Sequence, residues 1–199
     1  MPKDYAEAVK WFRKAADGGN AQAQSFLGLM YGFGRGVPKD EAEAVKWIRK
    51  AADGGDADTQ YMLGVMYEDG LGVPKDEAEA VKWFRKAADQ GYADSQSFLG
   101  MMYANGRGVS KDEAEASKWY RKAADQGLAK AQSNLGDMYA NGQGVPKDGA
   151  EAYKWFLLAG AQGDEDAKKA ISEIELRITR VQVNEGQRRA RAWKPQKKP

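Results

Sequence analysis

The chain has 199 residues, of which 30% are charged and 42% hydrophobic, and its formal net charge is +2. This balance is typical of a soluble folded protein, and no apolar run approaches the roughly 18 residues of a membrane span. Cysteine and histidine are both absent, which excludes disulfides, thiol nucleophiles, the usual near-neutral proton shuttle and the commonest metal ligand. No apolar signal-like stretch follows Met1, so the chain as written is expected in the cytoplasm, whereas an N-terminally trimmed fragment would be an exported protein.

A period of 36 residues organises the chain. Tryptophan occurs once in each period, at Trp11, Trp47, Trp83, Trp119 and Trp155. The segments 38–73 and 74–109 differ at only 10 of their 36 positions. A fixed period of this length indicates a repeat architecture, either a solenoid or a propeller, and outweighs other predictions of fold class.

The first part of each repeat is predicted to be a helix, as in residues 38–52. Asp40 suits the N-cap, Glu43 three residues later completes a capping box, and Gly55 is a left-handed stop after the helix. One apolar face follows from the spacing of Ala44, Trp47, Ile48 and Ala51. The tryptophan of each repeat is therefore predicted to be a buried anchor.

A second helix is predicted from about Ala57 to Tyr67, with Gly64 at a position where a side chain would hold neighbouring helices apart. Its buried stripe is expected to consist of Thr59, Leu63, Met66 and Tyr67. The glycine-bracketed segment 70–73 follows a helix and lacks the Lys-Ser/Thr sequel of a phosphate loop. We therefore interpret it as a turn.

The N-terminal end opens on a first-type helix, Asp4 to Ala16, without a second-type helix before it. This helix still carries Trp11, Phe12 and Ala15, so one apolar face is expected to be uncovered. Repeat arrays need polar caps for solubility. Either the chain is a fragment, or this end associates with a second copy.

The C-terminal end leaves the period after Gly163. The predicted divisions are a repeat array at 1–163, capping helices within 164–193 and a basic disordered tail at 194–199. Helices are expected over 164–178 and, capped by Thr179, over 181–193. From Lys168 onward there are ten Lys/Arg and three Asp/Glu. Three interpretations of this positive charge stay open. The charges can simply be solvated, or they can contact nucleic acid, although the segment lacks the interleaved aromatic residues of a stacking platform. In the third interpretation the tail binds in the acidic groove of its own or another chain.

The repeated motifs identify a resemblance. The pattern Ala-Gln-x-x-Leu-Gly-x-Met-Tyr, seen at residues 131–139, is followed by Gly-x-Gly-Val, Pro-Lys-Asp and Ala-x-Lys-Trp-Phe-Arg-Lys-Ala-Ala-Asp-x-Gly. From residue 2 to about 168 the chain resembles Sel1-like repeat proteins, relatives of tetratricopeptide repeats. The resemblance implies an all-α fold, a right-handed α-solenoid of antiparallel helix pairs, and an adaptor role in protein complexes, often in bacteria. A secreted branch is rich in cysteine, from which this chain departs.

Differences between the repeats mark a candidate site. Positions that vary along the second helices recur at spacings of 3, 4, 3 and 1, which places them on one stripe away from the Leu/Met/Tyr face. In tetratricopeptide repeats the corresponding stripe lines the concave surface, so the resemblance implies a partner-binding groove here. The predicted partner-binding residues are Gln22, Ser25, Leu29, Phe33, Asp58, Tyr61, Val65, Glu68, Asp69, Asp94, Ser97, Met101, Asn105, Lys130, Ser133, Asp137 and Asn141.

The chemistry of this stripe indicates the partner. Its apolar members are Leu29, Phe33, Tyr61, Val65 and Met101, and its charged members are mostly acidic. A contiguous apolar patch often marks an interface, although such residues can also pack against neighbouring helices inside the array. We expect a protein or peptide partner that is basic or amphipathic.

The leading functional hypothesis is a non-enzymatic scaffold or adaptor, with no cofactor, no metal and no catalytic residues. An enzyme of the hydrolase type is the alternative, because Ser110 and Ser133 lack a histidine but a lysine-assisted serine stays open. The Asp/Glu pairs recur in every repeat at cap positions, whereas a catalytic pair should be unique. A third alternative is a near-consensus or engineered array without a natural partner. Binding to nucleic acid or membrane is not expected.

Overall fold

The computed structural model describes residues 4–196, and within them it contains eleven α-helices and no strand. The chain divides into two compact units after Gln90. The N-terminal unit holds α1 (Tyr5–Asp17), α2 (Ala21–Phe33), α3 (Glu41–Asp53), α4 (Ala57–Asp69) and α5 (Glu77–Asp89). The C-terminal unit holds α6 (Ala93–Asn105), α7 (Glu113–Asp125), α8 (Ala129–Asn141), α9 (Gly149–Ala161), α10 (Glu165–Glu175) and α11 (Arg180–Ala192).

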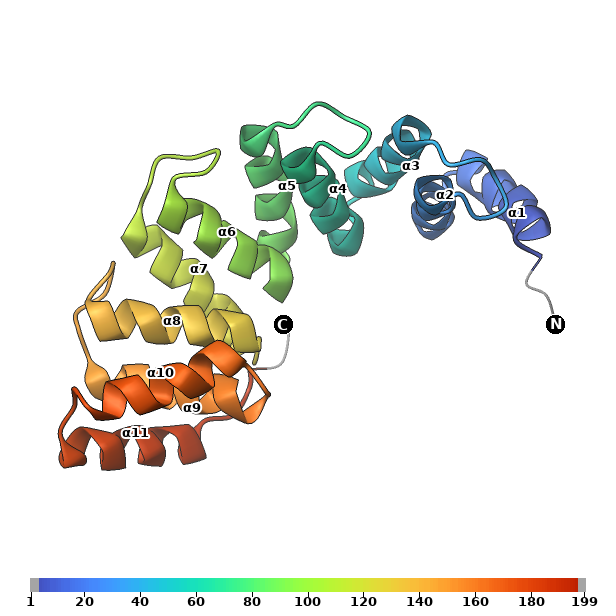
Figure 1. The fold of residues 1–199 in the computed structure, drawn as a ribbon. Helices are drawn as coiled ribbons and strands as arrows, with labels where there is room; N and C mark the ends of the chain where they lie inside the picture. The colour runs from blue at the N-terminus through green and yellow to red at the C-terminus, as the bar shows by residue number, and fades with distance from the viewer. Residues whose placement is uncertain (1–3, 197–199) are drawn as a thin grey trace. The chain divides into compact units, whose positions relative to one another are not determined.

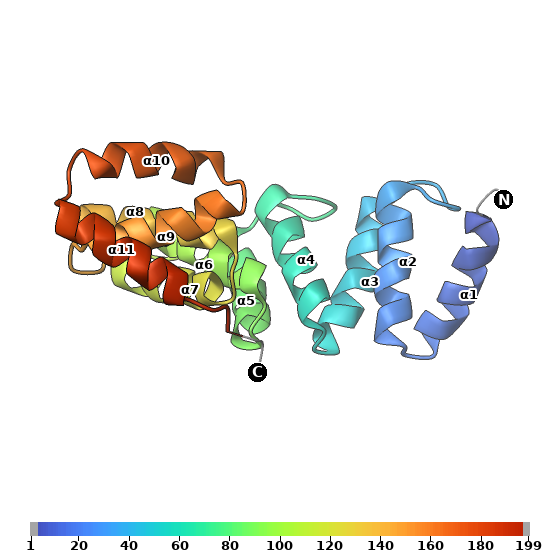
Figure 2. The same ribbon diagram turned by 90° about the horizontal axis from the view of Figure 1, so that it is seen from below.

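Most helices pack against their neighbours in sequence (Figure 1). In the N-terminal unit, α2 packs against α1 and α3, and α4 packs against α3 and α5. In the C-terminal unit, α6 to α9 continue this scheme, and both α10 and α11 pack against α9 (Figure 2). The helical pairing and the 36-residue period confirm the predicted all-α solenoid class.

The first-type helices begin as predicted, but the capping box is only half formed. The Asp40 side chain accepts a hydrogen bond from the Glu43 backbone N–H, at 2.9 Å. The Glu43 side chain does not return to the cap; it accepts from the Trp47 indole Nε1 at 3.0 Å and from Lys46 Nζ at 2.8 Å. The N–H of a buried indole needs an acceptor, and Glu43 accepts from Trp47. The Glu43 side chain therefore does not complete the reciprocal capping box, and that prediction is wrong here.

The loops between repeats depend on glycine. Gly70 and Gly72 adopt left-handed conformations with φ of 73° and 71°, a region that favours glycine. A Cβ at Gly72 would also collide with the Glu41 carbonyl. The segment is therefore the tight turn that the sequence predicted, and it brings the end of α4 back beside the start of α3.

Four of the five periodic tryptophans are buried. Trp47, Trp83, Trp119 and Trp155 are at most 6% exposed, which confirms the prediction for their repeats. Trp11 is 64% exposed, and here the anchor prediction is wrong. Burial of this face requires a helix on the N-terminal side, and no described residue lies there to cover α1.

Two further contacts set how closely the helices approach. A Cβ added at Gly64 would lie 2.7 Å from the Phe84 ring, so the missing side chain allows α4 to contact α5, as predicted. A buried glutamine ladder was not predicted: Gln132 donates to the Ala124 carbonyl at 3.1 Å and accepts from Gln162 at 2.9 Å. The nitrogen and the oxygen of the buried Gln132 amide are thereby both paired.

The C-terminal helices close the array. Thr179 and Gln182 form a reciprocal capping box at the start of α11, as predicted for Thr179. Arg189 of α11 binds Glu151 of α9 at 2.8 Å, and Trp193 stacks edge-on against Trp155 with centroids 6.4 Å apart. The tail was predicted to be disordered from Lys194. The structure holds its start by a 2.7 Å hydrogen bond from the Gln196 N–H to the Asp125 carbonyl, and residues 197–199 lie outside the described part of the chain.

Candidate functional site

An apolar cleft of about 350 Å³ opens on the N-terminal unit. Its two walls are second-type helices: α2 provides Leu29 and Phe33, and α4 provides Tyr61 and Val65. Its floor is the first-type helix α3, through Ala44 and Ile48. Four residues predicted from the repeat comparison thus line one cavity, which is the geometry that the predicted groove requires.

Local sequence explains why this cleft is open. Gly28 faces Ile48 so closely that an added Cβ would lie 2.7 Å from the isoleucine side chain, so α2 settles deeply onto α3. Phe33, at the end of α2, remains 66% exposed and has the Arg35 guanidinium 5.2 Å above its ring. The result is a shallow apolar surface with an aromatic edge.

The C-terminal unit carries a second pocket of about 210 Å³ at the equivalent place in the repeat. Asp137, Asn141 and Phe156 lie 108 residues, or three periods, after Leu29, Phe33 and Ile48. The walls are α8 and α10, with α9 beneath them. The fold therefore presents the same cleft twice, with different chemistry.

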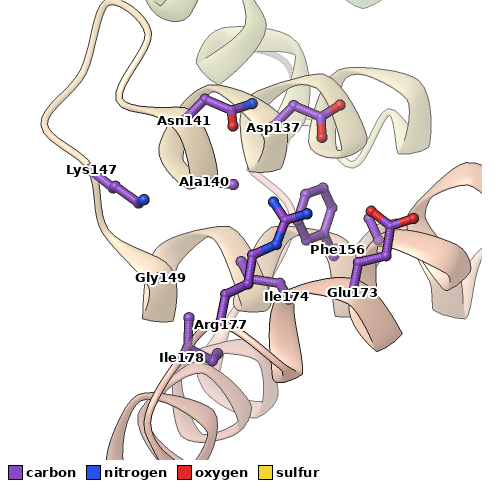
Figure 3. A pocket seen from close by; sticks show the side chains of 11 residues that line it. Asp137, Ala140, Asn141, Lys147, Gly149, Phe156, Glu173, Ile174, Arg177 and Ile178 are labelled. Atoms are coloured by element: carbon purple, nitrogen blue, oxygen red, sulfur yellow. The ribbon is translucent and has the colours of Figure 1, made fainter.

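Four charged residues line the second pocket beside apolar ones, whereas only Glu41 is charged in the lining of the first cleft. Figure 3 shows Asp137, Glu173 and Arg177 directed into the space above Phe156. Partial desolvation raises the pKa of the Asp137 carboxyl above its ordinary value, Lys130 opposes the shift, and repulsion from nearby carboxylates including Glu173 adds to it. This pocket suits a polar segment, whereas the first cleft suits apolar side chains.

Most predicted site residues lie at the surface, and two do not. Glu68 and Ser133 are 8% and 3% exposed, so their assignment to a binding surface is wrong. Ser133 lies on α8, which contacts both α9 and α10. The exposed members are Gln22, Phe33, Asp58, Asp69, Asp94, Asn105, Lys130, Asp137 and Asn141; the half-buried members are Ser25, Leu29, Tyr61, Val65, Ser97 and Met101.

Met101 fits the alternative interpretation, in which residues of the apolar stripe pack against neighbouring helices inside the array. It packs against the core cluster that contains Ala116, Tyr120 and Trp155. Leu29 and Phe33 instead line the open cleft. The stripe is therefore partly core and partly accessible surface.

Sequence reasoning missed the floors of both clefts. Ile48 is predicted for the core and is buried, as expected. The change of this residue to Phe84, Tyr120 and Phe156 in later repeats was a usable signal that it also forms a cleft floor. Glu173 lies on α10 and Arg177 follows the end of that helix, both beyond the last full period. The repeat comparison stopped at Gly163, although Glu173 lies three periods after the cleft residue Val65 and one period after Asp137.

The residues considered for catalysis or metal binding do not form a common site. Ser110 lies exposed in the loop before α7, and Ser133 is buried. In residues 4–196, no group of three or more Asp or Glu side chains is arranged to hold a metal ion. No helix in this range is long and apolar enough to cross a membrane.

Comparison with known proteins assigns the repeats to a family. The model of the Sel1 repeat matches residues 1–20, 21–56, 57–92, 93–128 and 129–164. The chain belongs to the Sel1 repeat family. Proteins of this family are generally interaction scaffolds, generally lack catalytic activity and typically bind other proteins. No curated protein gives a significant match.

Solved structures show the same fold. The protective antigen c5321 of uropathogenic Escherichia coli is 37% identical with a TM-score of 0.84, and the match covers 94% of this chain and 40% of that one. A Sel1 repeat protein from Oxalobacter formigenes is 39% identical with a TM-score of 0.80, over 87% of this chain and 51% of that one. This chain thus spans about half or less of the length of these two Sel1 relatives.

The cysteine-rich branch is represented as well. Cysteine rich protein B of Helicobacter pylori is 26% identical with a TM-score of 0.53, over 66% of this chain and 95% of that one. The present chain contains no cysteine, so disulfides do not contribute to the stability of its repeats.

Proposed function

We propose that this Sel1 repeat protein is a non-enzymatic scaffold that holds an amphipathic segment of another protein in the cleft of the N-terminal unit. The observation that carries the proposal is the convergence of Leu29, Phe33, Tyr61 and Val65 on one apolar cavity. These positions vary between repeats, as expected for side chains that contact a partner rather than the array.

The partner's apolar side chains supply most of the affinity in this proposal. Burying one aliphatic or aromatic side chain contributes roughly 1.5–3 kcal/mol. Charges on the rim are partly balanced already, because Lys39 pairs with Glu41 at 2.6 Å. Asp58 and Asp69 remain exposed near the two ends of α4. They favour a partner with cations beside its apolar residues, mainly through association rate and specificity.

The equivalent pocket of the C-terminal unit is proposed as a second contact. Its charged residues, among them Asp137 and Arg177, suit polar groups of a partner. Two clefts of unlike chemistry would let one scaffold distinguish partners that share only an apolar motif.

A peptide-display selection on the purified chain tests the main proposal. Enriched peptides should combine aromatic or aliphatic residues with Lys or Arg, and their affinities are measured by calorimetry. Replacing both Leu29 and Val65 by Asp should weaken binding at least about tenfold, because two apolar contacts are lost. The matched control is Leu176→Asp, since Leu176 is 89% exposed on the other unit.

Circular dichroism verifies that each variant remains folded. Selection of acidic peptides over basic ones, or unchanged affinity in the double cleft variant, would contradict the proposal. Loss of affinity in the Leu176 control would also contradict the proposal, because this residue lies between α10 and α11 and does not line the cleft.

A further inference from the structure

A third recess, of about 710 Å³, lies on the C-terminal unit and shares only Lys147 with the pocket above Phe156. Residues of α7, α8, α9 and α11 and of the loop before α9 line it. Four of its lining residues are cationic and two are anionic, so the lining carries a formal charge of +2. The cationic residues are Arg121, Lys147, Lys154 and Arg189, and the anionic ones are Asp148 and Glu151.

Two of these cations already use both carboxylates. Arg189 of α11 contacts Glu151 at 2.8 Å and Asp148 at 3.4 Å, and Lys154 contacts Glu151 at 3.4 Å. The Lys154 side chain is only 13% exposed where α11 packs against α9, whereas Lys118 at the same register is 68% exposed. This inner group of charges is therefore balanced and held in place.

Lys147 has lost the partner that its counterparts keep. In the three preceding repeats the lysine of this loop pairs with a glutamate two residues later. The pairs are Lys39–Glu41 at 2.6 Å, Lys75–Glu77 at 3.5 Å and Lys111–Glu113 at 2.8 Å. Position 149 is instead glycine, and a Cβ there would lie 2.5 Å from the Ile178 side chain. Among the described residues no carboxylate lies within ion-pair distance of Lys147, and Figure 3 shows it apart from Asp137 and Glu173.

Arg121 is the second cation without an ion pair. Its guanidinium lies 5.3 Å from the centre of the Tyr139 ring and donates a hydrogen bond to the Tyr139 hydroxyl. It attracts the Asp125 carboxylate, but in the described part of the chain it makes no salt bridge. Because the Tyr139 oxygen accepts from Arg121, the O–H of this tyrosine can donate to a ligand. A guanidinium fixed against a ring also keeps its other N–H groups in a defined plane.

We propose that this recess binds the phosphate group of a phosphorylated serine or threonine in a partner protein. Such a group carries a charge of roughly −1.5 to −2 and has three strong acceptor oxygens. Its charge matches the two cations that have no ion pair, and its oxygens can accept from Arg121, Lys147 and the Tyr139 hydroxyl. A carboxylate carries a single charge and leaves one of the two cations without a partner.

The recess suits one phosphate rather than a nucleic acid. Its cations form one confined group, whereas a polynucleotide requires cations along a row of phosphates. Tyr139 is the aromatic residue of the lining, and Arg121 occupies a face of its ring, which a base would need for stacking. The proposed site is separate from the apolar cleft of the N-terminal unit and does not depend on a partner binding there.

Nuclear magnetic resonance titration of the full chain with N-acetyl-O-phosphoserine amide tests the proposal. Saturable shifts are expected at Lys147 and Arg121, with a dissociation constant in the millimolar range. The N-acetylserine amide should cause none of these shifts, and N-acetylglutamic acid amide should bind at least about tenfold more weakly, because its single charge matches one cation only.

Two variants and a matched control separate binding at the recess from general charge attraction. Lys147→Gln should weaken phosphoserine binding at least about tenfold, and Tyr139→Phe about threefold, because one donor is lost in each. Lys111→Gln should leave the affinity unchanged, since Lys111 occupies the same register but already pairs with Glu113. Circular dichroism verifies that each variant is folded.

The proposal is overturned by several outcomes of the same titrations. They are an absence of saturable shifts, equal affinity for the glutamate compound, an unchanged affinity in Lys147→Gln, or an equal loss in Lys111→Gln. Tighter binding of a single-stranded DNA oligomer at the same residues, or of vesicles that contain phosphatidylserine, would assign the recess to another class of ligand and would also overturn it.

Discussion

The contrast between Trp83 and Trp11 gives the sharpest test of how this fold is stabilised. The two residues occupy the same register in α5 and α1. Trp83 is 4% exposed in a cluster with Val45, Ile48 and Leu63, whereas Trp11 is 64% exposed. Replacing each by alanine therefore removes the same side chain from two different environments.

The expected costs follow from the buried area. A buried tryptophan removes about 150–250 Å² from water, which at about 25 cal/mol/Å² gives roughly 4–6 kcal/mol as an upper bound. Core truncations of this size usually cost about 3–5 kcal/mol, and we expect this loss for Trp83→Ala. The same area argument leaves roughly 1–2 kcal/mol as the upper bound for Trp11→Ala.

Urea unfolding followed by far-UV circular dichroism measures both variants. The experiment compares the unfolding transition that involves the N-terminal unit. Equal losses in the two variants, or a Trp83→Ala transition that matches the parent, would refute the reasoning that burial rather than register determines the contribution of each tryptophan.

Three further predictions concern contacts of different kinds. Gly64→Ala should destabilise the N-terminal unit by about 1–2 kcal/mol in urea unfolding, because the clash with Phe84 exceeds the gain in helix propensity; Phe84→Leu in the same chain should reduce this loss. Asp137→Asn should raise the melting temperature at neutral pH, because the folded-state pKa of Asp137 is raised and its ionised form is disfavoured; the difference should vanish once the pH falls below the ordinary pKa of 3.8. Arg189→Met should cost about 1 kcal/mol and speed amide exchange in α11, since its pairing with Glu151 is lost; an effect that high salt does not reduce would contradict the ion-pair explanation.

Local interactions could be predicted from the sequence. Asp40 caps α3, Thr179 caps α11 and Gly70 terminates α4 because each effect acts within a few residues of the chain. The capping box failed at Glu43 because its carboxylate met the indole of Trp47, one turn away. Both partners were visible in the sequence, but the choice between them depends on which ring becomes buried.

The stripe of second-helix positions that vary between repeats was informative, because variation indicates which side chains are free of stacking contacts. It located Leu29 and Tyr61 in the cleft correctly, since residues free of the stacking contacts can differ between repeats. It failed at Glu68 and Ser133, which are buried. Variation between repeats does not by itself separate exposed positions from buried ones.

By itself, the sequence determined the period and the succession of helices, because hydrophobic spacing and capping act along the chain. Only the tertiary structure decided which copies of a repeated residue are buried. Trp11 and Trp47 have the same register, but the amount of water that each ring loses depends on the helices beside it. The two clefts differ for the same reason: equivalent positions share a backbone, and the side chains that neighbouring helices bring together give each its chemistry.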